Sequence, residues 1–393
     1  MTVNHVQRLR QRGQIIIITV LLVGLAAGFS VYGLSRPRNP VLDDAVQTGR
    51  ALALARDALI SYSLAAVSAT SRPGALPCPD RSGNGSASTC NNVGRRIGLL
   101  PWKTLGIPEL RDGSGAPLLY AVSNVHRSTT GILNSDTSGD YTVTGLESAT
   151  GVIAVIFAPG TAVGNQRRDA TVAACATTGT NIARNLCPAN YLEGGNDDGN
   201  TSFVTAAASA SFNDKLLLIT TDNLYPAVTT YVARRAREAL NTFYNTPGMG
   251  RFPYAANMAD AAYNCTVGVT QGRLAQVTTD TIACPLLSGS ATLPNWFSAN
   301  NWHQLIFYAV SPLCVSTATA ASCQSTGGLS LIGGAGNVRS LLIVSGRAYT
   351  GQARPCVTAL DCLEDDENRN GDSVFQSPSL STTNNDRLVV VAP

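Results

Sequence analysis

The sequence is poor in charged residues, aromatic residues and histidine. Charged residues make up 13% of the 393 residues, aromatic residues 6%, and there are three histidines. Beyond the first 13 residues no stretch is rich in lysine and arginine, so nothing indicates a nucleic-acid partner. No Ser/His/Asp set or carboxylate pair accompanies His126 or His303, which we expect to be surface or satisfied polar residues. We therefore predict that the protein is not an enzyme.

Ten cysteines are present, but none of them forms a CxxC pair. Without that spacing, and with so few histidines, a zinc site is disfavoured and disulfides in an oxidising compartment are expected. The cysteines lie in close pairs along the chain, and this proximity alone suggests which ones are joined. The expected pairs are Cys78–Cys90, Cys175–Cys187, Cys265–Cys284, Cys314–Cys323 and Cys356–Cys362.

Near the N-terminus a basic stretch precedes a long apolar run. The run, Gln14–Leu34, carries no charge and as a helix would span about 31 Å, which is enough to cross a bilayer. It is longer than the apolar part of an ordinary signal peptide, and the small residues Ala26–Gly28 lie inside it instead of after it. The three arginines ahead of the run favour a cytoplasmic N-terminus. We predict a transmembrane helix over residues 14–40; a cleaved signal peptide is the alternative.

The part of the chain beyond the membrane contains an internal duplication. Six stretches return in the same order, with a helix-type pattern first and strand-type runs afterwards. The matches are 55–59 with 236–240, 100–102 with 293–296, 118–123 with 306–311, 151–160 with 339–348, 191–203 with 362–374, and 213–220 with 385–392. We therefore predict two tandem modules, residues 41–222 (module 1) and residues 223–393 (module 2).

We expect each module to pack one helix on an antiparallel β-sheet, an α+β fold. Apolar residues three and four apart predict helices around Leu52–Tyr62 and Val232–Phe243, the second behind Pro226 as a helix-start signal. Trp102 and Trp296 are expected in the core. The predicted strands are Leu118–Val122, Val152–Phe157, Leu216–Thr220, Ile306–Val310, Leu341–Val344 and Leu388–Val391.

A basic leader that ends in Gly13, an apolar helix that continues into an amphipathic helix, and a small sheet together resemble the type IV pilin-like (prepilin-type) proteins. Residues 72–123 also resemble a bacterial subgroup of prepilin-type proteins. The resemblance implies that a prepilin peptidase removes the leader 1–13 and leaves Gln14 as the methylated first residue. It also implies a single-pass anchor in the bacterial inner membrane, with the modules periplasmic or extracellular, and assembly with other pilin or pseudopilin subunits.

Two positions depart from the usual pattern of these proteins. Most members have Phe as the first and Glu as the fifth mature residue, where this chain has Gln14 and Ile18. That glutamate pairs with the amino terminus of a neighbouring subunit, so its absence fits a subunit with no neighbour ahead of it. The resemblance thus implies a minor pilin or a type II secretion pseudopilin near a filament tip, acting in assembly or surface contact. The alternative is a membrane-anchored extracytoplasmic adhesin or binding module that is never processed after Gly13.

Two short motifs offer further contacts. In DDENRNGD (365–372), Asp366, Asn368 and Asn370 have the spacing of the first positions of a calcium loop, so calcium is the one candidate cofactor. No glutamate follows at the twelfth position, and an Asn/Asp-rich turn without a metal is the simpler interpretation. Gly24 and Gly28 form a GxxxG pattern suited to close packing of transmembrane helices, although small residues are common in any apolar helix.

Overall fold

The computed structural model describes residues 40–65, 72–90, 97–127, 131–169, 186–247, 249–275, 293–324, 328–334 and 336–392. Residues 14–39 of the predicted transmembrane segment lie outside these ranges. Within them, no helix combines the length and the apolar character that crossing a membrane requires. The helices are α2 (Pro40–Ala65), α3 (Asn124–Arg127), α4 (Thr221–Tyr244), α5 (Asn295–Ala299), α6 (Ala320–Cys323), α7 (Ala359–Cys362) and α8 (Asp366–Arg369), with 3-10 turns η3 (Pro188–Asn190), η5 (Trp302–Leu305) and η6 (Pro312–Cys314).

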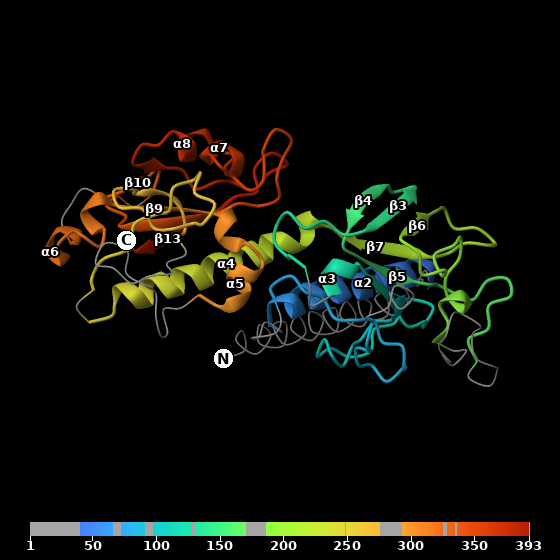
Figure 1. Cartoon of the computed structure of the whole chain (residues 1–393). Helices are drawn as coiled ribbons and strands as arrows, with labels where there is room; N and C mark the ends of the chain where they lie inside the picture. Colours follow the sequence, from blue (N-terminus) through green and yellow to red (C-terminus); the bar gives the residue numbers. More distant parts are fainter. Residues whose placement is uncertain are drawn as a thin grey trace, which may run out of the picture. The chain divides into compact units, whose positions relative to one another are not determined.

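Two four-stranded antiparallel sheets form the centre of the fold (Figure 1). In both sheets the strands lie side by side in the order in which they occur in the chain, β1-β2-β5-β7 in one sheet and β8-β9-β11-β13 in the other. All six predicted strands are present, each within two residues of its expected bounds, and β1 and β8 add an edge strand to each sheet. The strands are β1 (Ile97–Leu99), β2 (Leu119–Val122), β5 (Ala154–Ala158), β7 (Lys215–Ile219), β8 (Gln271–Arg273), β9 (Ile306–Val310), β11 (Ser340–Val344) and β13 (Arg387–Ala392).

The strand registers correct one of the sequence matches. Leu119 pairs with Phe157 in one sheet, and Phe307 pairs with Ile343 in the other. Because Leu119 and Phe307 occupy matching positions, Phe157 corresponds to Ile343 and Gly160 to Gly346. The match of 151–160 with 339–348 is therefore two residues out of register, a slip that similar apolar runs allow because they carry little positional information.

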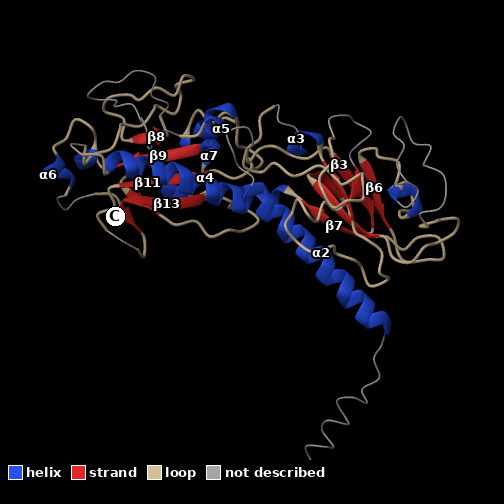
Figure 2. Cartoon of the chain, turned by 90° about the horizontal axis from the view of Figure 1, so that it is seen from below, coloured by secondary structure: helices blue, strands red, loops and turns tan. Residues whose placement is uncertain are grey.

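A long helix covers one face of each sheet, which confirms the predicted α+β class. In α2, Leu52, Ala55 and Leu59 share a core cluster with Tyr120 of β2. In α4, residues three and four apart are buried on β11 and β13, as the apolar stripe predicts (Figure 2). The prediction that α4 starts behind Pro226 is wrong: the helix begins at Thr221, and Pro226 lies within it.

A capping interaction explains the earlier start of α4. The backbone N–H of Thr220 donates to the side-chain oxygen of Asn223, 3.0 Å away, which fixes the first turn ahead of the proline. Pro226 has no N–H, so the carbonyl of Asp222 loses its donor within the helix. Proline is statistically common at the start of helices, but in α4 the N-cap residue Thr220 sets where the helix begins.

The opposite face of each sheet is also covered, which the sequence did not indicate. In module 1 the layer is a three-stranded sheet of order β4-β3-β6, in which β3 and β6 run parallel. In module 2 the parallel pair β10 and β12 takes its place. Phe203 of β6 and Phe375 of β12 contact Phe157 and Phe307 of the central sheets. These strands are β3 (Tyr141–Gly145), β4 (Ala149–Val152), β6 (Ser202–Thr205), β10 (Ser330–Leu331) and β12 (Val374–Phe375).

Of the two tryptophans expected in the core, Trp296 is buried and Trp102 is partly exposed. The Trp102 ring lies against Gly85 of a polar loop, where a Cβ on that glycine would come within 2.5 Å of the ring. Gly85 also has a positive φ of 83°, which glycine adopts without strain. Trp102 therefore seals a loop and is not part of the packing between helix and sheet.

Candidate functional site

The predicted processing and membrane residues, Gly13, Gln14, Gly24 and Gly28, lie outside the described residues. The site that can be built from the structure is thus in the two modules. It comprises the disulfides, a set of polar residues that recurs in both modules, and the contacts between the modules.

Three of the five expected cysteine pairs have both members in the described part of the chain, and all three are bonded. Cys187 and Cys265 are also in disulfides, but the cysteines expected to pair with them, Cys175 and Cys284, lie outside the described residues. Each observed bridge spans 12 residues or fewer and so fixes a local turn. The bridges are Cys78–Cys90, Cys314–Cys323 and Cys356–Cys362.

The three residues of the proposed calcium loop do not converge on one point. Asp366 is 88% exposed and pairs with Arg369 of the same helix turn. The buried Asn368 amide brackets the backbone of Gln376, donating to its carbonyl and accepting from its N–H, both at 2.8 Å. Asn370 accepts from the N–H of Asp372 at 2.9 Å. In the described ranges no three His, Cys, Asp or Glu residues are grouped to hold a metal ion.

A connected set of polar residues joins three loops of module 1. Gln166 donates to Glu193 at 2.5 Å, and Glu193 accepts from the N–H of Asn213 at 3.0 Å. Asp214 in turn accepts from the Glu193 N–H at 2.9 Å and from the buried Asn196 side chain at 3.0 Å. These bonds tie the loop after β5 and the loop before β6 to the start of β7.

Module 2 repeats these contacts with the same residue types. Gln352 donates to Glu364 at 3.0 Å, and Glu364 accepts from the Asn385 N–H at 3.1 Å. Asp386 accepts from the Glu364 N–H at 3.0 Å. The sequence comparison found the Leu-Glu and Asn-Asp pairs but missed the two glutamines, because they lie in a loop that the misaligned apolar runs placed out of register.

An arginine two residues after each glutamine was missed for the same reason. Arg168 donates to the carbonyl of Gly160 at 2.6 Å, and Arg354 donates to that of Gly346 at 3.3 Å. The pattern Gly-x5-Gln-x-Arg is present in both copies and could have identified all of these residues.

Burial shapes the charge state of this polar set. It raises the pKa of Asp214, which lies beside Glu193, and raises that of Asp386, where the negative charge of Glu364 adds to the effect. In both aspartates the second carboxyl oxygen, Oδ1, is buried without a hydrogen-bond partner in the described part of the chain. Burial therefore favours the protonated form of each aspartate, and the hydrogen bonds of the set hold the loops together.

Of the two alternatives expected for the histidines, a surface position is wrong because both are buried, whereas His126 has a polar partner. His126 lies 3.2 Å from the Tyr225 hydroxyl, and burial together with Arg72 lowers its pKa to about 3. The ring of His303 packs edge-on against Tyr263, and burial lowers its pKa to about 4. Both rings are thus held neutral. A lone histidine carries no pattern by which its burial could have been predicted.

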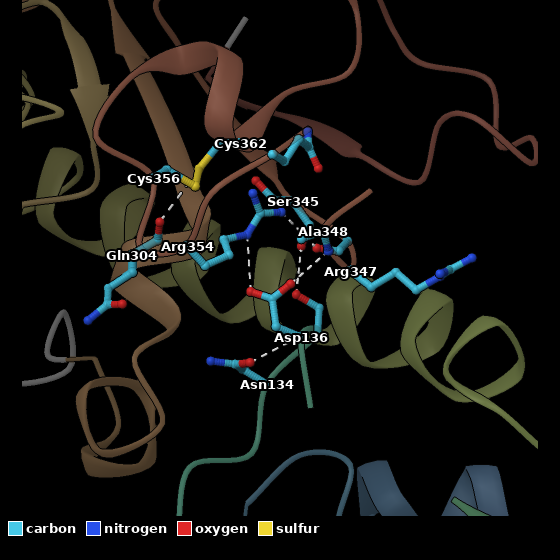
Figure 3. Close-up of polar contacts among 12 residues, drawn as sticks. Asn134, Asp136, Gln304, Ser345, Arg347, Ala348, Arg354, Cys356 and Cys362 are labelled. Carbon is cyan, nitrogen blue, oxygen red and sulfur yellow. Dashed lines mark hydrogen bonds and ion pairs between the residues drawn. A yellow bond between two sulfur atoms is a disulfide. The ribbon is translucent and has the colours of Figure 1, made fainter. Parts of the chain in front are cut away.

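The carboxylate of Asp136 joins module 1 to module 2 (Figure 3). One oxygen accepts from the N–H of Ala348 at 2.8 Å, and the other accepts from Nε of Arg354 at 3.0 Å. The side chains of Arg354 and Asp136 are 14% and 24% exposed, so this ion pair is largely removed from solvent.

Asn300 of module 2 supports the same segment of module 1 from a second side. Its side-chain oxygen accepts from the N–H of Leu133 at 2.9 Å, and its carbonyl accepts from the side chain of Asn134 at 3.0 Å. The Ser135 hydroxyl donates to the carbonyl of Ser345 at 2.9 Å. Residues 133–136 are therefore a buried polar anchor between the modules, which no sequence pattern predicted.

Comparison with known proteins adds no assignment: no protein-family model, curated protein or solved structure matches this chain.

Proposed function

We propose that this chain is a non-enzymatic minor pilin or pseudopilin subunit of a type IV pilus-like or type II secretion filament, placed near the filament tip. The observation that carries the proposal is the basic leader ending in Gly13, followed at once by the uncharged run Gln14–Leu34. The run would anchor the subunit in the bacterial inner membrane and would then enter the filament core. The disulfides support an extracytoplasmic position for both modules.

The presence of two modules in one chain supports the tip position. The two modules share one contiguous buried core, which includes Tyr120 of module 1 and Tyr308 of module 2. The anchor at residues 133–136 adds polar contacts in which both partners are largely buried. Two modules joined in this way cannot separate to fit a shaft in which each step has room for one, so a place at the end of the filament suits them better.

Intact-mass and N-terminal analysis of the full chain, produced together with a prepilin peptidase and extracted from membranes, tests the proposal. We expect the mature chain to begin at Gln14 with a methylated amine. Gly13→Leu should keep the leader, whereas Gly24→Leu, a matched change inside the apolar run, should be processed normally. A soluble chain beginning near Phe29 would indicate an ordinary signal peptide. A membrane-bound chain that keeps its leader would favour the unprocessed adhesin or binding module.

A further inference from the structure

Module 2 contains a cavity of about 290 Å³ beside the first turns of α4. Its walls are α4, with Tyr225 and Thr229, the turn after β11, with Gly346 and Arg347, and the loop before β13, with Thr382. The lining is mostly apolar, and one edge is closed by an exposed ion pair in which Arg347 lies 2.8 Å from Asp222.

The equivalent place in module 1 is filled by the chain itself. The helix match pairs Thr48 with Thr229, and the sheet registers pair Gly160 with Gly346. In module 1 the loop 110–117 lies between the two equivalent residues. Its Asp112 carboxylate accepts from the Gly160 N–H at 2.8 Å, and its Gly113 N–H donates to the Thr48 hydroxyl at 2.9 Å. Asp112 is 1% exposed, so its carboxylate is buried in this site.

Module 2 keeps both attachment points but has no such loop. The chain between Trp296 and Tyr308 is shorter than its counterpart in module 1 and forms α5 and η5 instead. Gly346 is buried, and its N–H makes no hydrogen bond within the described part of the chain, although the unpaired Oδ1 of Asn385 lies beside this glycine. The Thr229 hydroxyl donates to the carbonyl of Tyr225 at 2.8 Å, which leaves its oxygen able to accept. Buried N–H groups are rarely left without a partner, so the Gly346 N–H is a candidate donor to a group that enters the cavity.

We propose that this cavity binds an aspartate-bearing turn of another polypeptide chain, in the place that the Asp112 loop takes in module 1. The ligand carboxylate would accept from the Gly346 N–H, and a backbone N–H of the same turn would donate to the Thr229 hydroxyl. The inference rests on the comparison of the two modules and holds whether or not the chain is a pilin subunit.

The test uses a blocked peptide with the sequence of residues 110–117, Ac-LRDGSGAP-NH2, and the full chain in detergent. Saturation-transfer NMR measures binding of the peptide and of a version with asparagine in place of aspartate. The exposed Thr382 lines the cavity, and Thr382→Trp should fill it. Ala210 is the exposed counterpart of Thr382 in module 1, where the site is already occupied, so Ala210→Trp is the matched control.

We expect saturable binding of the aspartate peptide, weakened at least tenfold by Thr382→Trp and unchanged by Ala210→Trp. The asparagine peptide should bind about tenfold more weakly, because a hydrogen bond to a charged acceptor is worth more than one to a neutral acceptor. Both tryptophan variants should keep the melting temperature of the parent chain. Absence of saturable binding, equal binding of both peptides, or equal effects of the two tryptophan variants would each overturn the proposal.

Discussion

Replacing Asp136 by alanine should weaken the junction between the modules more than any surface ion pair does. The change leaves the Arg354 guanidinium without its counterion and the Ala348 N–H without its acceptor. Arg354 is 14% exposed, so water replaces the lost carboxylate only in part.

The size of the effect follows from this partial burial. Removing one partner of a fully buried ion pair costs about 3–5 kcal/mol, whereas exposed pairs contribute about 0–1 kcal/mol. The pair of Asp136 and Arg354 lies between these limits, and Arg354 retains its bond to the Gly346 carbonyl. We therefore expect Asp136→Ala to lower the free energy of unfolding by about 2–3 kcal/mol. Asp136→Asn, which keeps an acceptor for Ala348 but loses the charge, should cost about half as much.

Urea unfolding of the full chain, followed by tryptophan fluorescence, measures these differences. Trp302 is fully buried in module 2 and reports on the unfolding of that module. The matched control is Glu238→Ala, which removes a carboxylate from exposed pairs with Arg234 and Arg235 on α4 and should cost less than about 1 kcal/mol. Equal losses for Asp136→Ala and Glu238→Ala would refute the reasoning that burial gives the Asp136 contact its strength.

Three further predictions concern pH and close packing. Burial lowers the pKa of His126 to about 3, so between pH 6.5 and 3 the unfolded chain binds a proton that the folded chain does not. The free energy of unfolding therefore falls as the pH drops through this range. His126→Gln should reduce this loss, measured by urea titrations at several pH values. Burial raises the pKa of Asp214, so the effect of this group on stability has the opposite sign: the free energy of unfolding falls as the pH rises above about 4. Asp214→Asn should flatten this part of the plot of unfolding free energy against pH. An unchanged plot would contradict the raised pKa of Asp214. Gly346→Ala would place a Cβ 2.1 Å from the Asn385 side chain and should destabilise by about 2 kcal/mol in thermal unfolding, whereas Gly336→Ala, which meets nothing within 4 Å, should change stability by less than about 0.5 kcal/mol.

The sequence predicted the elements whose patterns are local. The apolar stripe that includes Leu240 placed α4 on its sheet, and continuous apolar runs such as Leu341–Val344 placed the strands. It did not predict the layer on the outer face of the module 2 sheet, because β10 and β12 have only two residues each and carry no readable period.

The site was less predictable than the fold, since it depends on contacts between distant residues. Asp136 and Arg354 are 218 residues apart in the chain, and nothing in either local sequence points to the other. Gln166 and Gln352 recur in both modules, but they became visible only when the strand registers corrected the alignment by two residues. The duplication was predicted from stretches such as the Leu-Glu and Asn-Asp pairs, which keep their order in both modules.

The most direct test of the proposed role is to count and locate this chain on isolated filaments. An epitope inserted at Thr383, in the exposed loop before β13, can be labelled with gold and compared with the same label on the major subunit. We predict one or a few labels per filament, confined to one end, and loss of filament formation when the chain is deleted. Label along the whole shaft in numbers like those of the major subunit would contradict the tip position, and filaments that never carry the label would contradict the assignment as a filament subunit.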